Sequence, residues 1–263
     1  MHKWNQFLKN NVHIFSYIRF FSNWWKIYAH KYGMLQMPFQ MRARKGVSFW
    51  VRTKEDLGII FEVFIGEVYT SHLSIHPHDT VIDIGGHEGI FSLYAASRQA
   101  VVYTYEPDPY NFEWLQKNKK LNPSLDIRAQ QYACFEKSGK KNLFLREKSS
   151  RGGNSFFIHD VHHESILVQC TTLEDIIQTH EIAKVHFLKI DCEGSEFSIL
   201  RTLPDAIFEK IFQIAVEVHS GPAFGDGSVH EIIQILESHG FFIQAHIFLT
   251  DEFSIIQATK KSI

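Results

Sequence analysis

The chain alternates short apolar runs with longer segments in which apolar residues recur every three or four positions. Short apolar runs predict buried strands at 80–84, 101–106, 126–132, 185–191 and 211–218. Helical spacing predicts helices at 88–98, 109–121, 194–202 and 228–239. Strands that alternate with helices of this length need right-handed crossovers, so the pattern predicts an α/β protein with a parallel sheet.

The last part of the chain departs from this alternation. Residues 241–248 and 253–258 have the pattern of two strands, joined only by turn residues at 250–252. So short a connection allows only an antiparallel pair. A seven-stranded sheet that is parallel except for a reversed strand in this terminal hairpin is the Rossmann-like layout of class I methyltransferases. Between 133 and 184 we expect an insertion with strand-like pieces at 142–146 and 166–171.

Residues 1–54 differ from the rest of the chain in charge. They hold ten Lys or Arg and no Asp or Glu, whereas the remaining residues hold 17 basic and 29 acidic side chains. Aromatic and basic residues alternate over 4–32, which predicts a helix packed on the core, with contact to an anionic membrane surface as the alternative. We therefore divide the chain into a basic, aromatic leader at 1–54 and a methyltransferase-like domain at 55–263. A short strand at 47–53 and an amphipathic helix at 56–69 connect the two.

Composition adds a few limits. A chain of 263 residues with 44% apolar residues is long enough for one large domain with a buried core. The three cysteines, Cys134, Cys170 and Cys192, lack metal-ligand spacing and form an odd set, which favours a reducing compartment. We expect a cytoplasmic protein with a small-molecule or glycan substrate and no nucleic-acid partner.

A glycine-rich turn follows the first of the alternating strands. Asp83 lies two residues before Gly85, and Gly86 and Gly89 complete the turn before a helical pattern begins. Glycine lets the backbone turn sharply and approach a ligand that a Cβ atom would obstruct. A strand, a glycine turn and a helix form the nucleotide site at the carboxyl edge of open α/β sheets, so we place a cofactor at this turn.

Two cofactors fit such a turn, a nicotinamide dinucleotide and S-adenosylmethionine. Glu106 ends the second strand, and its carboxylate can accept hydrogen bonds from both ribose hydroxyls of either cofactor. A G-x-G-x-x-G motif ending at Gly89 needs glycine at position 84, where Ile84 stands. An acid beside the turn suits the ammonium group of S-adenosylmethionine and would repel a pyrophosphate. The sequence therefore favours S-adenosylmethionine. We expect Ala133 and Cys134, which follow the third strand, to border its adenine.

Several motifs occur in a fixed order along the chain. They are Asp-Ile-Gly-Gly-His-Glu-Gly at 83–89, Tyr-Glu-Pro-Asp-Pro at 105–109 with Asn118 and Asn122 after it, Thr-Leu-Glu-Asp at 172–175, Phe-Leu-Lys-Ile-Asp-Cys-Glu-Gly-Ser-Glu at 187–196, and Val-Glu-Val-His at 216–219. In these motifs the chain resembles the FkbM family of S-adenosylmethionine-dependent methyltransferases over roughly 55–220. The resemblance implies methylation of a hydroxyl oxygen, often on a sugar, a glycan or a natural product. The family usually has Ala-Asn where this chain has Gly86 and His87.

The ends of the fourth and fifth strands supply the candidate catalytic residues. Strand alternation places Asp191 and Glu193 on one side, and Glu217 and His219 share a face of the next strand. A hydroxyl nucleophile must lose its proton, and a histidine with a pKa near neutrality suits that task. We predict His219 as the first candidate for the general base and Asp191 as the second. Asp191 is also placed at the methionine end of the cofactor, and Glu193 completes the catalytic set.

The same residues are open to other interpretations. Asp191, Glu193, Glu217 and His219 are ligand types that Mg²⁺ or Mn²⁺ accept, but acid–base roles account for them without a metal, and we predict none. A nicotinamide-dependent Rossmann oxidoreductase would keep the fold and change the cofactor. A non-catalytic protein that binds nucleic acid or a membrane surface through the leader would need no cofactor at all.

Overall fold

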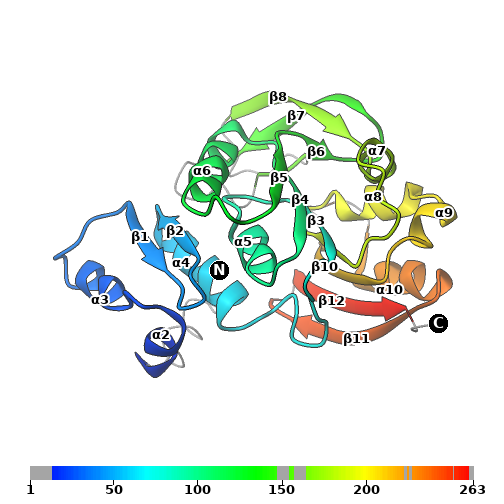
Figure 1. Ribbon diagram of the computed structural model, residues 1–263. Coiled ribbons are helices and arrows are strands. Elements are labelled where there is room, and N and C mark those ends of the chain that lie inside the picture. The colour runs from blue at the N-terminus through cyan, green and yellow to red at the C-terminus, as the bar shows by residue number, and fades with distance from the viewer. Residues whose placement is uncertain are drawn as a thin grey trace.

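A seven-stranded sheet forms the centre of the computed structural model, which describes residues 14–146, 154–156, 164–221, 224, 227–250 and 252–260 (Figure 1). Its strands are β3 (Thr80–Ile84), β4 (Val101–Tyr105), β5 (Ile127–Gln130), β9 (Phe187–Ile190), β10 (Gln213–His219), β11 (Phe241–Phe248) and β12 (Phe253–Lys260). They lie in the order β11-β12-β10-β9-β3-β4-β5. β12 runs antiparallel to both of its neighbours, and the other pairs are parallel. The predicted class I methyltransferase layout, with its reversed hairpin strand, is confirmed.

Helices cover both faces of this sheet because successive strand residues point to opposite sides. Val81 and Phe187 belong to the apolar core on one face, and Ile82 and Leu188 to the core on the other. The first core includes side chains of α4 (Lys54–Phe64) and α5 (Ile90–Ala96). The second includes side chains of α7 (Leu173–Thr179), α8 (Glu196–Thr202), α9 (Asp205–Phe208) and α10 (Val229–Ser238). Helix α6 (Pro109–Lys120) contacts β5 at the edge of the sheet.

The insertion after β5 forms a small sheet of its own. β6 (Ala133–Cys134), β7 (Gly139–Leu145) and β8 (Glu164–Thr171) make three strands in the order β6-β8-β7, at the top of Figure 1. The two strand-like pieces expected at 142–146 and 166–171 lie in β7 and β8. Helix α7 was not predicted; it has only seven residues, and the Thr172 side chain caps its start by accepting a hydrogen bond from the Asp175 amide.

The leader contains more elements than its pattern predicts. Instead of one helix over 4–32, the described part has α2 (Ile14–Phe20) and α3 (Trp25–Lys31), and residues 4–13 lie outside the described residues. The helix breaks where Phe21 is fully buried and bridges to Ala43. A hairpin follows, with β1 (Phe39–Arg42), which was not predicted, and β2 (Ser48–Val51), which was.

Two asparagines of the family motifs fasten this hairpin to the domain. Asn118 accepts a hydrogen bond from the Trp50 amide at 2.8 Å, and its side chain donates to the Glu88 carbonyl at 2.8 Å. Asn122 accepts from the Ser48 amide at 2.9 Å and donates to the Ser48 carbonyl. The leader hairpin is therefore attached beside the glycine turn, where it can influence the cofactor site.

No helix in the described part of the chain is both long and apolar enough to cross a membrane. Contact between the leader and a membrane surface stays a prediction.

Candidate active site

The glycine turn between β3 and α5 is shaped by neighbouring strands. Gly85 and Gly89 have φ values of 79° and 84°, a region that favours glycine. A Cβ atom on Gly85 would lie 1.7 Å from the backbone oxygen of Asp191, and one on Gly86 would lie 2.2 Å from the Thr104 hydroxyl. The sequence suggested that a ligand excludes the Cβ atoms here, but contacts inside the protein already do so. The turn is thus held directly against the end of β9.

Asp83 is fully buried behind this turn. Its carboxylate lies 3.2 Å from Lys189 Nζ and accepts a hydrogen bond from the Ser92 hydroxyl at 2.6 Å. Lys189 also lies 3.2 Å from Asp191 Oδ2 and donates to the Gly85 carbonyl. Burial disfavours the charged lysine, but Asp191 and Asp83 outweigh it and raise the pKa of Lys189. In this arrangement Asp83 supports the turn through Lys189, and the direct contact with a ligand ammonium stays a prediction.

Glu106 lies at the end of β4, next to the turn. Its Oε2 accepts a hydrogen bond from the His87 amide and its Oε1 from the Asp108 amide, each at 2.8 Å. Burial raises the pKa of Glu106 to about 8, although these amides favour the charged form. The two predicted adenine neighbours, Ala133 and Cys134, are buried in β6 beyond the end of β5. Their cofactor contacts stay predictions.

Arg52 completes the turn and was missed by the sequence patterns. It follows β2, and its Nε lies 2.7 Å from Glu88 and 3.1 Å from Asp56. Its Nη2 lies 3.3 Å from Nε2 of His87, the residue in the position usually taken by asparagine. Burial and the guanidinium lower the pKa of His87 to about 4, so the ring is neutral at neutral pH. The sequence around Arg52 gives no sign that this side chain contacts His87, which lies 35 residues further along the chain.

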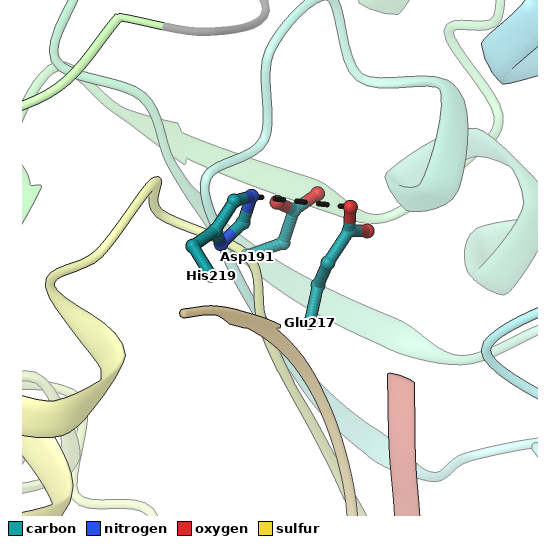
Figure 2. Close-up of side chains that lie close together, drawn as sticks. All are labelled: Asp191, Glu217 and His219. Carbon is teal, nitrogen blue, oxygen red and sulfur yellow. Dashed lines mark ion pairs between the residues drawn. The ribbon is translucent and has the colours of Figure 1, made fainter. Parts of the chain in front are cut away.

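A second group of polar residues lies at the ends of β9 and β10. Asp191, Glu217 and His219 each present a ligand-type atom, and these three atoms lie within 4.8 Å of one another (Figure 2). Tyr69, which no pattern marked, holds two of them: its hydroxyl lies 3.0 Å from Asp191 Oδ2 and 2.6 Å from Glu217 Oε2. The structure thus brings together the acids predicted on two separate strands. We call Asp191, Glu217 and His219 the strand-end cluster.

Carboxylates surround His219 on several sides. Its Nδ1 lies 2.6 Å from Glu196 Oε1, and its Nε2 lies 3.5 Å from Glu193 and 3.9 Å from Glu217. Burial disfavours the charged ring, but Glu193 and Glu196 outweigh it and hold the pKa of His219 well above its usual value. A ring that already carries its proton at neutral pH is a poor proton acceptor. The predicted first choice of general base is therefore weakened by its surroundings.

The acids of this region differ in their charge states. Burial alone would raise the pKa of Asp191, but Lys189 and His219 together lower it. Burial and the nearby Asp191 raise the pKa of Glu217 to about 7, and burial raises that of Glu193 to about 8. Glu62 of α4 is a further acid whose pKa burial, Glu217 and Asp191 raise to about 8. Asp191 is thus the acid of this group that is held charged, and it becomes the stronger candidate for the base.

A class I methyltransferase is defined by this combination: the sheet order with its reversed strand, the glycine turn after β3, and acids at the ends of β4, β9 and β10. A family model, the Methyltransferase FkbM domain, matches residues 83–243. The chain belongs to this family, and its cofactor is S-adenosylmethionine, which excludes the nicotinamide alternative. The acidic donor set fits a cationic cofactor that carries two ribose hydroxyls.

The curated proteins that this chain is similar to include methyltransferases. The 31-O-demethyl-FK506 methyltransferase FkbM of Streptomyces tacrolimicus is 28% identical over 217 residues, which cover 70% of this chain and 81% of the relative. The hexuronic acid methyltransferase AglP of Haloferax volcanii is 26% identical over 144 residues, covering 54% of this chain and 57% of the relative. Among solved structures, the magnesium protoporphyrin IX methyltransferase ChlM of Synechocystis with bound SAM has a TM-score of 0.46 at 12% identity, covering 96% of this chain and 99% of that one.

Proposed function

We propose that this methyltransferase transfers the methyl group to a hydroxyl oxygen of a sugar, glycan or natural product. The observation that carries the proposal is the strand-end cluster of Asp191, Glu217 and His219, which adjoins the glycine turn because Gly85 packs on the Asp191 backbone. Carboxylates accept hydrogen bonds from hydroxyl groups and repel other carboxylates and phosphates. An acceptor that presents neutral hydroxyl groups therefore fits this end of the site better than an anionic one.

The names of two relatives agree with a polyoxygenated acceptor, but a hexuronic acid carries a carboxylate, so its name does not support a neutral one. One relative is named for a 31-O-demethyl substrate, and the other for a hexuronic acid. Both names describe those proteins, and they support an oxygen acceptor on a polyoxygenated molecule for this chain.

Each part of the site has a proposed task. When bound, S-adenosylmethionine supplies a methyl group on a positively charged sulfur. Glu106 would accept hydrogen bonds from the ribose hydroxyls, and the glycine turn at 85–89 would border the methionine end. Asp191 would accept the hydroxyl proton, while Glu196 keeps the His219 ring in place. Alignment of the reacting atoms and exclusion of water supply most of the rate enhancement in such a displacement.

The test measures methylation of an acceptor panel. Purified protein is incubated with S-adenosylmethionine and neutral sugars, uronic acids or hydroxylated macrolides, and S-adenosylhomocysteine formation is followed. Mass spectrometry with fragmentation then locates the new methyl group. We expect an O-methyl product, and Asp191→Asn should lower kcat by at least about 100-fold, the lower end of the range for a lost proton acceptor. The matched control is Asp205→Asn, whose side chain is 93% exposed on α9.

Two results would contradict the proposal. A methyl group found on nitrogen or carbon would reassign the acceptor chemistry. An Asp191→Asn enzyme as active as Asp205→Asn would move the acceptor away from the strand-end cluster.

A further inference from the structure

We propose that the strand-end cluster of Asp191, Glu217 and His219 binds one divalent metal ion. Two carboxylate oxygens and one imidazole nitrogen converge within 4.8 Å of one another from the ends of β9 and β10 (Figure 2). Metal–ligand bonds of about 2.0–2.3 Å place two donors of one ion at most about 4.6 Å apart, so small side-chain movements suffice to bring all three donors onto a single ion. The sequence alone gave no reason to require a metal here, because it could not show that the three side chains converge.

Each of the three side chains is held by one atom and leaves another atom available. Tyr69 contacts Oδ2 of Asp191 and Oε2 of Glu217, and Lys189 also approaches Oδ2 of Asp191. Among the described residues, no hydrogen bond reaches the second oxygen of either acid. The fixed atoms orient the two carboxylates, and the remaining oxygens are available to bind an ion.

His219 has the orientation that metal-binding histidines usually show. Glu196 binds its Nδ1 at 2.6 Å and also accepts a hydrogen bond from its backbone amide at 2.8 Å. A carboxylate on one ring nitrogen fixes the ring and increases the basicity of the other nitrogen, an arrangement characteristic of metal ligands. The Nε2 atom, in a side chain that is only 2% exposed, lies 3.5 Å from Glu193 and 3.9 Å from Glu217, and no hydrogen bond joins it to a described residue. An ion that binds there would replace the proton on this nitrogen.

The acids around the cluster also outnumber the cations that face them. Lys189 is shared with the fully buried Asp83, so it compensates only part of the charge of Asp191. Glu217 and Glu193 face the single imidazole of His219, which Glu196 already engages. Asp191 and Glu217 are 25% and 18% exposed, so an ion can enter from solvent.

The donor set indicates the kind of ion. Two carboxylates and one imidazole favour hard or borderline divalent ions such as Mn²⁺ or Mg²⁺ over the soft ions that thiolates select. The binding of the ion does not depend on the proposed function, but its role in the reaction does. In that role the ion would bind the acceptor hydroxyl, lower the pKa of that hydroxyl and let its proton pass to water. Asp191 would then be a ligand and not the proton acceptor.

The experiment measures Mn²⁺ binding to the full-length protein by electron paramagnetic resonance, without any methyl acceptor. We expect about one bound Mn²⁺ per chain and nitrogen coupling from His219 in the pulsed spectrum. Glu217→Gln should raise the Mn²⁺ dissociation constant at least about tenfold, and His219→Gln should abolish the nitrogen coupling. The control is Glu113→Gln, an exposed acid on α6. Binding of S-adenosylhomocysteine by Glu217→Gln shows that the variant is folded.

Three results would overturn the inference: absence of stoichiometric Mn²⁺ binding, equal affinity of the Glu217→Gln and Glu113→Gln proteins, or displacement of Mn²⁺ by S-adenosylhomocysteine. The last would assign the surplus negative charge to the cofactor. If the protein binds no Mn²⁺ and still methylates a hydroxyl acceptor in the presence of a chelator, the metal site is rejected and the proposed function stands. Mn²⁺ binding without methylation of any hydroxyl acceptor would support the metal and reject the proposed function.

Discussion

At the glycine turn, the buried acids Asp83 and Glu88 each lie close to a cation, whereas at the ends of β9 and β10 acids outnumber the cations that face them. Asp83 has Lys189, and Glu88 has Arg52. Asp191, Glu193 and Glu217 share the ammonium of Lys189 and the imidazole of His219, and they are partly open to solvent. These two buried ion pairs form without a ligand and give the glycine turn a rigid frame. Acids that outnumber their cations leave a place that a substrate or an ion can fill.

Removing Lys189, the cation beside Asp83, should have the largest effect on stability. Lys189→Met leaves Asp83 buried without its cation, and breaking a buried pair in this way costs about 3–5 kcal/mol. Urea unfolding measures the loss. Lys117→Met, which breaks an exposed pair with Glu113 on α6, should cost less than about 1 kcal/mol. Equal losses in the two variants would show that the frame does not depend on this pair.

The next largest effect should be on the affinity for the cofactor, after substitution of Glu106. Above pH 8, where Glu106 is charged, Glu106→Gln removes one of two charged acceptor oxygens. A hydrogen bond to a charged group is worth about 1.5–3 kcal/mol. We therefore expect the dissociation constant of S-adenosylhomocysteine, measured by calorimetry, to rise about 10- to 100-fold. Glu113→Gln serves again as the exposed control. Unchanged affinity in Glu106→Gln would remove Glu106 from the ribose site.

Local patterns were sufficient to predict most of the fold. The strands 80–84 and 101–106 match β3 and β4 within one residue, because each is a mostly apolar run followed by turn residues. The reversed hairpin followed from its short connection. The leader was harder, because its helix ends at Phe21 only through burial and a bridge to Ala43, which are contacts that periodicity does not record.

The glycine turn and the strand-end cluster also differ in how much the sequence could predict. Asp83, the glycines and Glu106 lie in contiguous motifs at strand ends, so sequence alone could place them. Tyr69 reaches Asp191 across 122 residues of chain, and only the folded sheet brings them together. The pKa of His219 depends on Glu193 and Glu196, whose distances from the ring no spacing could supply.

A smaller effect tests whether Tyr69 orients the two acids of the strand-end cluster. Tyr69→Phe removes the hydroxyl that contacts Asp191 and Glu217 and keeps the ring that packs on Phe91. Loss of this bond should lower kcat/KM about tenfold, equivalent to about 1.4 kcal/mol, with S-adenosylhomocysteine affinity unchanged. Tyr32→Phe, at a side chain that is 69% exposed, is the control. A loss of cofactor affinity instead would place Tyr69 with the frame of the glycine turn and not with the strand-end cluster.

The smallest effect concerns His87, where this chain departs from the usual asparagine. Its pKa is lowered to about 4, so the unfolded chain binds a proton at this residue more readily than the folded protein does. Stability should therefore fall on acidification, beginning near the ordinary pKa of 6.5 and ending near 4. Between pH 6.5 and 5.5 the loss from this residue is about 1 kcal/mol.

His87 has a φ of 50°, a conformation that asparagine also tolerates, so His87→Asn should keep the turn and flatten this part of the urea-unfolding profile. His78→Asn, also at positive φ but exposed, should leave the profile as it is in the wild type. An equally steep profile in His87→Asn would mean that the guanidinium of Arg52 does not hold this ring neutral.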